Sequence, residues 1–309
     1  MKEGDSSLSE ERIVKLLSSF FKAPEKWIGI GDDTALLKYG SRNLLFTCDV
    51  LNEGVHFKRS YFPPYYLGWK LIAINVSDII SKGGKPSACL LFFNLSFSDR
   101  KWLKELMRGI KSSSKKFGVK IVGGNTSASK SISLGCAMLG TCGEDKFIPR
   151  KGAKAGEKVY LLGIPGLSHA GMKLLKKYGY NSALKIWKKA VMAHLKPEPP
   201  IYMIDNIIKH FSPSSMTDTS DSLIESLFNI LTPELDIHIS HIPLHKKISL
   251  KEAMMGGEDY NLLFTSSSEN KSKFPVNQIG ILVKGSGKVK FLEGGLKKEI
   301  KRKGFFSHF

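Results

Sequence analysis

Hydrophobic and polar residues follow one another along this chain in short blocks whose period changes several times. Over 9–21 the apolar positions recur at intervals of three and four residues, which predicts an amphipathic helix. Helices are also predicted over 66–81, over 100–117, from residue 168 onward and over 224–231. Short apolar runs predict strands at 36–37, 44–47, 88–95, 119–122, 132–141, 158–162, 260–265 and 278–283. Helices and strands alternate, so we expect an α/β fold.

A polar, glycine-containing connector at Arg150–Gly156 separates two series of predicted elements. Because a domain usually has roughly 100 to 200 residues, a chain of 309 residues is expected to form two. We predict an N-terminal domain over 1–148 and a C-terminal domain over 149–309, each long enough to bury its own core.

The apolar segments are too short to cross a membrane. The longest, Ala88–Phe97, is interrupted by polar residues and falls short of the ~18 apolar residues that a span needs. Acidic residues precede the first apolar stretch, so we expect no secretory leader. Four cysteines stand far apart without a CxxC pair, which indicates reduced thiols. The sequence therefore predicts a cytoplasmic protein.

Lysine and arginine number 47 against 28 aspartate and glutamate, which gives a formal net charge of +19. Such an excess can neutralise nucleic-acid phosphates. The basic residues are scattered, however, and their densest cluster, at 297–303, contains no aromatic side chain on which a base could stack. A nucleic-acid-binding module stays a distant alternative to a lysine-rich solvated surface or to a field that attracts anionic small substrates.

Aspartates gather in four loops, at 31–33, 47–49, 76–78 and 217–221, where predicted strands or helices end. In a chain this basic, such loops are unexpected. Aspartate oxygens are the ligands that Mg²⁺ prefers, usually shared with substrate phosphates. Each aspartate taken alone also fits a helix cap or a turn, and Asp218 and Asp221 could simply begin the helix that follows them.

Two glycine-rich turns supply the complementary half of a phosphate site. Gly123-Gly124-Asn125-Thr126 follows a predicted strand, and Gly256-Gly257-Glu258-Asp259 precedes one. Backbone N–H groups of such turns can approach phosphate oxygens closely, although each turn alone is equally explained as a tight turn. Together with the four aspartate loops, they predict an enzyme that uses a magnesium–nucleotide complex.

Five segments, in this order, follow the pattern of a known family. They read Ile30-Gly31-Asp32-Asp33-Thr34-Ala35, Thr47-Cys48-Asp49-Val50-Leu51-Asn52-Glu53-Gly54-Val55-His56-Phe57, Asn75-Val76-Ser77-Asp78-Ile79, Asp218-Thr219-Ser220-Asp221 and Gly256-Gly257-Glu258-Asp259-Tyr260. Over nearly the whole chain they resemble the thiamine-monophosphate kinases, of the superfamily of aminoimidazole ribonucleotide synthetase and selenophosphate synthetase. The resemblance implies ATP-dependent phosphorylation of thiamine monophosphate to thiamine diphosphate by direct in-line transfer with several Mg²⁺ ions.

The resemblance also implies a two-domain fold like that of aminoimidazole ribonucleotide synthetase, in which the N-terminal α/β domain forms the sheet or barrel of a homodimer and a C-terminal α/β domain lies beside it. Another ATP-dependent phosphoryl-transfer or ligase enzyme of the same superfamily stays the nearer alternative. No reactive cysteine stands in a glycine-rich N-terminal loop, which argues against selenophosphate synthesis.

Residue roles are carried over by matching position. The implied Mg²⁺ ligands are Asp33, Thr47, Cys48, Asp49, Asp78, Asn125, Asp218 and Asp221. The implied ATP contacts are Gly124, Asn125, Arg150 and Ser220, and the implied thiamine contacts are His56, Glu258 and Phe306, or Phe305 if the tail is aligned on Gly304. Cys48 stands where the family usually has Thr or Ser, so either its backbone carbonyl contributes instead or that ion binds weakly. Asn125 stands where many members have Asp and keeps an amide oxygen able to coordinate.

Overall fold

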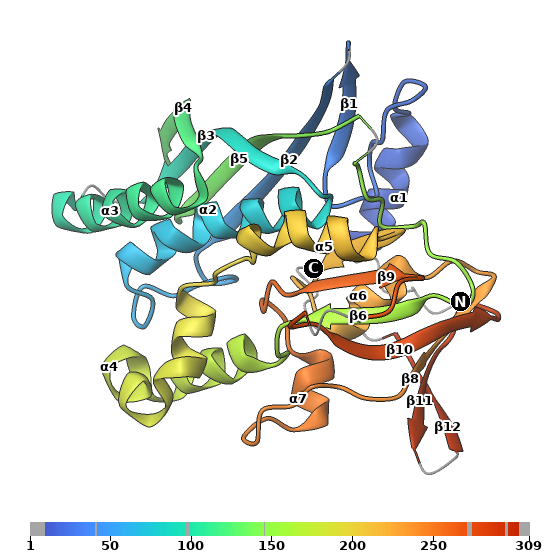
Figure 1. Cartoon of the computed structure of the whole chain (residues 1–309). Coiled ribbons are helices and arrows are strands. Elements are labelled where there is room, and N and C mark those ends of the chain that lie inside the picture. The colour runs from blue at the N-terminus through green and yellow to red at the C-terminus, as the bar shows by residue number, and fades with distance from the viewer. Residues whose placement is uncertain are drawn as a thin grey trace, which may run out of the picture.

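The computed structural model describes residues 10–40, 42–96, 99–144, 146–270, 274–293 and 296–302 (Figure 1). Their strands form a five-stranded and a seven-stranded sheet, with helices packed against both, so the fold is α/β as predicted. In this part of the chain no helix is long and apolar enough to cross a membrane.

The five-stranded sheet is built from the N-terminal half. Its order is β1 (Ala35–Tyr39), β2 (Arg42–Asn52), β5 (Ser133–Cys142), β3 (Lys85–Leu95) and β4 (Lys120–Ala128), and among these neighbours β3 and β4 run parallel. Helix α2 (Pro64–Ser81) packs on β2 and β5, and α3 (Arg100–Phe117) packs on α2. Helix α1 (Glu10–Phe20) precedes the sheet.

The ends of α3 follow local sequence rules. The Asp99 side chain accepts from the backbone N–H groups of Lys101 and Trp102, and Gly118 closes the helix in the left-handed conformation at φ 73°. The helix therefore spans the residues that the apolar period predicts.

The seven-stranded sheet is built from the C-terminal half. Its order is β12 (Leu296–Ile300), β11 (Val289–Glu293), β8 (Leu235–Ile239), β10 (Asn277–Lys284), β6 (Lys158–Leu162), β9 (Leu262–Ser266) and β7 (Ser215–Asp218). The helices of this half are α4 (Leu167–Leu195), the 3-10 turn η1 (Ile201–Met203), α5 (Ile204–Phe211), α6 (Leu223–Ile230) and α7 (Leu250–Met255). Helix α4 is interrupted by non-helical backbone at Gly179 and Trp187.

Helix α2 lies where the two halves meet (Figure 1). It is buried nearly all round because it touches the five-stranded sheet on one side and β7, α4 and η1 on the other. One apolar cluster is continuous across this junction and contains Ile79, Met216 and Phe264. A second cluster lies under α6, β8 and β10. The predicted boundary at 148/149 falls between the last strand of the first sheet and the first strand of the second, and the division into two domains stays a prediction.

The apolar period predicted most of the longer elements, but it does not show whether an apolar face is buried. The amphipathic helix predicted over 9–21 is present as α1, and its apolar residues Leu16 and Phe20 are 52% and 75% exposed. The pattern did not find α5, β7, β8, α7, β11 or β12, which are short and depend on neighbours distant in sequence.

Candidate active site

A pocket of about 190 Å³ opens where β2 and α2 meet two loops of the C-terminal half, one following β7 and one preceding β9. Its lining includes six of the residues selected from the sequence. They are Asp49, His56, Asp78, Ser220, Asp221 and Glu258. The fold thus brings together residues as far apart in the chain as Asp49 and Glu258.

Thr47 and Asp49 lie on the face of β2 that meets α2, because side chains alternate along the strand, and Asp49 lines the pocket. The Thr47 hydroxyl donates a 2.6 Å hydrogen bond to Oδ2 of Asp78 on α2. Cys48, between them, is exposed on the opposite face of the sheet. Its thiol therefore faces away from the site, and a role for the Cys48 carbonyl stays a prediction.

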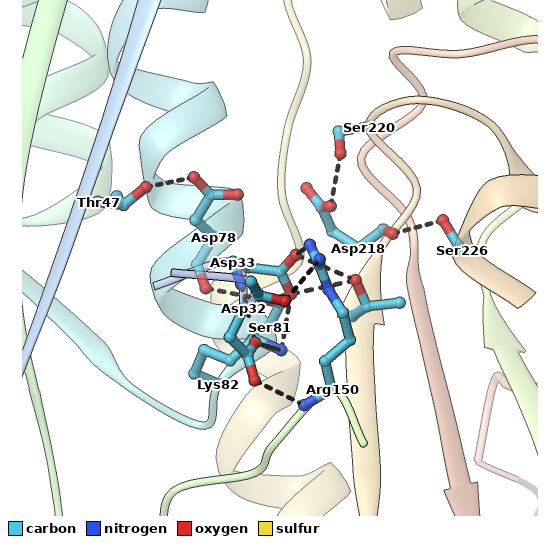
Figure 2. Close-up of polar contacts among 12 residues, drawn as sticks. Asp32, Asp33, Thr47, Asp78, Ser81, Lys82, Arg150, Asp218, Ser220 and Ser226 are labelled. Carbon is cyan, nitrogen blue, oxygen red and sulfur yellow. Dashed lines mark hydrogen bonds and ion pairs between the residues drawn. The ribbon is translucent and has the colours of Figure 1, made fainter. Parts of the chain in front are cut away.

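Ser77, next to Asp78 on α2, joins the two halves of the molecule. Its hydroxyl donates to Oδ2 of Asp218 at 2.5 Å, and the Ser220 hydroxyl donates to Oδ1 of the same carboxylate at 2.9 Å. Ser226, in the first turn of α6, donates to the Asp218 carbonyl at 2.8 Å. Asp218 is thereby held at the end of β7, facing α2 (Figure 2).

Three carboxylates of this group resist ionisation. Burial raises the pKa of Asp49 to about 6, with a further contribution from Asp221, and raises that of Asp218 to about 7, with a further contribution from Asp33. Burial, followed by repulsion from Asp49 and Asp218, also raises the pKa of Asp78 well above its usual range. Buried carboxylates that repel one another create a site at which a cation is strongly favoured.

Asp33 has the opposite environment. It is buried too, which opposes ionisation, but the Lys82 ammonium and the Arg150 guanidinium lower its pKa to about 2. Figure 2 shows both basic side chains converging on the Asp32–Asp33 pair. Arg150 also donates from its backbone N–H to Oδ2 of Asp32 at 3.0 Å and from Nη1 to the Gly31 carbonyl at 3.2 Å.

The other end of the pocket holds His56 and Glu258. The His56 Nδ1 atom accepts a 3.0 Å hydrogen bond from the backbone N–H of Asn52. Glu258 has a left-handed backbone, at φ 63°, and its backbone N–H bonds the Ser220 carbonyl at 2.5 Å. Its carboxylate meets Lys70 at 2.7 Å and His194 at 3.2 Å. Val55, Tyr61 and Met172 add apolar and aromatic surface to the pocket walls.

Gly124 and Asn125 lie elsewhere in the chain's fold. Across neighbouring strands, Asp49 pairs with Cys136, Cys136 with Leu91, and Leu91 with Gly124. Strand β4 therefore lies three strand spacings, or about 14 Å, from β2. A Cβ atom at Gly124 would collide with the Leu91 carbonyl, which explains the glycine by strand packing. Phe305 and Phe306, expected to contact thiamine, lie outside the described residues.

The sequence analysis did not select several residues of the site, among them Ser77, Lys82, Lys70 and Thr217. Ser77 and Thr217 each stand beside a selected aspartate, which was the available signal. Lys70 and Lys82 looked like two of many lysines, yet their side chains are only 1% and 0% exposed. Nothing in the sequence pattern distinguishes a buried lysine on a helix that is itself buried all round.

The donor set fits Mg²⁺. Asp49, Asp78, Asp218 and Asp221 offer hard oxygen ligands, and the raised pKa values of the first three mark buried negative charge that a bound cation would stabilise. No group of three or more His, Cys, Asp or Glu side chains in the described ranges is gathered tightly enough to hold an ion. Mg²⁺ usually takes only one or two carboxylates, with water and substrate phosphates filling its other positions.

Comparison with known proteins first defines the class. Residues 31–142 match the family described as AIR synthase related protein, N-terminal domain. The fold alone is shared with more distant proteins, such as the hydrogenase maturation protein HypE in complex with ATP, which has a TM-score of 0.66 and 16% identity, with 96% of each chain covered.

Closer relatives narrow this class. The thiamine-monophosphate kinase of Aquifex aeolicus (strain VF5) is 34% identical, over 91% of this chain and 92% of that protein. The enzyme of the same name from Buchnera aphidicola subsp. Schizaphis graminum is 33% identical, over 96% and 98% respectively. The solved structure of AaThiL complexed with AMPPCP and TMP has a TM-score of 0.86 and 32% identity, covering 99% of this chain and 100% of that one. The chain belongs to the thiamine-monophosphate kinase family.

Proposed function

We propose that this protein transfers the γ-phosphoryl group of ATP to the phosphate of thiamine monophosphate, producing thiamine diphosphate and ADP. The carrying observation is the pocket that joins Asp49, Asp78 and Asp221 at one end to His56 and Glu258 at the other. The likeness to AaThiL complexed with AMPPCP and TMP, over nearly all of both chains, supports the same two substrates here.

The nucleophile of this reaction is a phosphate oxygen. Its second pKa is ~6, so it is mostly ionised at neutral pH and needs no general base. The residues agree with this chemistry, because Nδ1 of His56 already accepts from the Asn52 N–H, and the other end of the pocket holds the carboxylates of Asp49, Asp78 and Asp221. The transfer is a direct in-line displacement whose main obstacle is repulsion between two polyanions.

Asp49, Asp78, Asp218 and Asp221 are the carboxylates that would hold Mg²⁺, with Thr47 orienting Asp78 through its 2.6 Å bond. Bound Mg²⁺ supplies charge compensation between the two phosphate groups. Ser77 and Ser220 fix Asp218 at both oxygens, so this ligand is oriented before any ion arrives. The Cys48 carbonyl and the Asn125 amide complete the set of proposed Mg²⁺ ligands. For Asn125 to coordinate, β4 has to approach the bound nucleotide.

The ATP contacts we propose are Arg150, Ser220, Gly124 and Asn125. Arg150 points its guanidinium at Asp33 beside the acidic group, where it can also meet a phosphate oxygen. At the other end, the Glu258 carboxylate provides a fixed negative charge and Tyr61 and Val55 provide ring-sized apolar contacts. This combination suits the cationic thiazolium and the pyrimidine of thiamine, with Phe306 added from the C-terminal tail.

We also propose a homodimer and a cytoplasmic location. The face of the five-stranded sheet opposite α2 exposes Phe46, Val50 and Leu90, and a second copy packed there would cover them. The four cysteines of the protein are free thiols, which suits the reducing environment of the cytoplasm. Sedimentation of the purified protein would decide the oligomeric state.

A coupled assay of ADP release tests the function. Thiamine monophosphate should support ADP release in the presence of Mg²⁺, and unphosphorylated thiamine should not, because it lacks the nucleophilic phosphate. ADP release that is indifferent to both compounds would instead favour another ATP-dependent enzyme of the AIR synthase related superfamily.

A further inference from the structure

Lys82 is the residue that follows the last turn of α2, and its side chain is fully buried. Its ammonium lies 2.8 Å from Oδ1 of Asp32 and 2.6 Å from Oδ2 of Asp33, and it donates to the Met216 carbonyl at 2.6 Å. These three acceptors match the three N–H donors of an ammonium group. The C-terminal end of a helix also favours a positive charge. Lys82 is therefore held as a fixed cation.

Both oxygens of Asp33 are occupied by partners from the protein. Oδ2 accepts from Lys82, from the Ser81 hydroxyl at 3.1 Å and from the Thr217 hydroxyl at 3.1 Å. Oδ1 contacts Arg150 and accepts from Thr217 at 3.2 Å. A carboxylate so surrounded has little free coordination capacity, and a metal ion approaching it would meet two positive charges.

The remaining carboxylates of the site differ in kind. Hydroxyl groups donate to the carboxylates of Asp78 and Asp218, and the charged groups that most affect their pKa values are other carboxylates. The site thus contains one aspartate that is already neutralised and several that are not, although matching position alone gave all of them the same role.

We infer that Lys82 is a built-in cation that replaces one divalent ion at Asp33, so that the ions of this site are held by Asp49, Asp78, Asp218 and Asp221 and not by Asp33. Lys82 then fixes Asp33 and, through it, Arg150 and Thr217, at the junction of the two halves. The inference rests on the proposed magnesium-dependent function, because it concerns how many ions that site takes.

The test counts ions directly. Mn²⁺, which is paramagnetic, replaces Mg²⁺, and electron paramagnetic resonance of the free ion gives the number bound per chain in the presence of AMPPCP. Asp33→Asn should leave that number unchanged, whereas Asp78→Asn, the matched control on the same α2 junction, should lower it. Asp33→Asn keeps the Lys82–Asp32 pair, and its melting temperature checks that the fold survives.

Removing the lysine provides the converse experiment. Lys82→Met should bind one additional Mn²⁺ per chain, and the gain should disappear in the Lys82→Met/Asp33→Asn double variant. A lower Mn²⁺ number in Asp33→Asn, or an unchanged number in folded Lys82→Met, overturns the inference while leaving the proposed function standing. If Lys82→Met does not fold, the Asp33→Asn number decides alone. No Mn²⁺ binding by the unaltered protein would overturn the inference and the metal-dependent function together.

Discussion

The Nζ atom of Lys70 on α2 lies 2.7 Å from Oε1 of Glu258, a residue 188 positions later in the chain. The lysine side chain is 1% exposed and the glutamate side chain 14%. The second oxygen of Glu258 lies 3.2 Å from Nδ1 of His194. Although burial opposes ionisation, Lys70 and His194 hold the pKa of Glu258 well below its usual range. Lys70 thereby keeps a negative charge in the wall of the substrate pocket.

Lys70→Met should destabilise the protein by about 3–5 kcal/mol, because removing one partner leaves a buried charge without compensation. The double variant Lys70→Met/Glu258→Gln should recover most of this loss, because no charge then remains unpaired. Urea unfolding measures the free energy of unfolding of each variant.

The exposed ion pair between Lys85 and Asp205 is the matched control. Its atoms are 2.9 Å apart, but its side chains are 66% and 70% exposed. Lys85→Met should change the free energy of unfolding by at most about 1 kcal/mol. Equal losses for Lys70→Met and Lys85→Met would contradict the special role of the buried pair.

Asp78→Asn and Asp218→Asn should each lower kcat by roughly 10²–10³-fold or more, because charge on the transferring phosphoryl group is then left uncompensated. In metal-free buffer neither variant should melt below the unaltered protein, since both pKa values are raised and the neutral amide relieves repulsion. Steady-state kinetics and thermal melts are the measurements. The control Asp205→Asn, at an exposed position, should change neither kcat nor the melting temperature. Near-normal kcat in both Asp78→Asn and Asp218→Asn would show that these carboxylates do not hold the metal ions.

Stability of the metal-free protein should rise as the pH is lowered from 8 to 6; below 6.5 the lowered pKa values of His169 and His194 contribute an opposite slope. The pKa of Asp49 is about 6 and that of Asp218 about 7, above the ordinary aspartate value. Between the ordinary and the raised values, the folded state binds more protons than the unfolded state, so the free energy of unfolding decreases with rising pH. Saturating Mg²⁺ should flatten this trend, because the ions compete with those protons.

Melting curves with EDTA and with Mg²⁺ across this range measure the effect. Asp33, whose pKa is lowered to about 2, contributes the opposite slope only below the ordinary aspartate range, outside the window tested. A melting temperature that falls from pH 8 to pH 6 in EDTA would show that the aspartates are not coupled as described.

The sequence alone was enough for the fold class and for six of the residues that line the pocket. Helix α3 is found by its apolar period and its caps, which are properties of neighbouring residues. The aspartate loops were found because acidic clusters stand out in a basic chain, and the structure brings Asp49, Asp78 and Asp221 into one pocket.

The sequence could not show which side chain each charged residue faces in the fold. Asp33 and Asp78 look alike in sequence, yet one faces Lys82 and the other faces Asp49, because the pairing depends on how α2 lies against β7. The apolar face of α1 is likewise exposed, and the sequence could not show this, since amphipathicity indicates that a face is apolar and not what covers it.

Phosphoryl transfer should proceed without a phospho-enzyme. His56 is held through Nδ1, which accepts from the Asn52 backbone N–H, and an acceptor phosphate that is already ionised needs no enzyme nucleophile. Both substrates should therefore have to bind before ADP forms. Incubation with ATP and radiolabelled ADP in the absence of thiamine monophosphate should give no exchange of label, and exchange under those conditions would indicate a covalent intermediate.

The neighbours Thr47 and Cys48 allow a test of how β2 presents its side chains, because one faces α2 and the other is exposed on the opposite face. Thr47→Val keeps the shape but removes the hydrogen bond to Asp78, so it should lower kcat and raise the Mg²⁺ concentration needed for half-maximal rate. Cys48→Ala removes only an outward thiol and leaves the backbone carbonyl in place, so both quantities should stay near their original values. If the thiol itself bound an ion, Cys48→Ala would instead raise the Mg²⁺ requirement, and the effect would grow with Mg²⁺ replaced by thiol-preferring Cd²⁺. Kinetics of the two variants over a range of Mg²⁺ concentrations separate these outcomes, because a carbonyl ligand at Cys48 survives the substitution and a thiolate ligand does not.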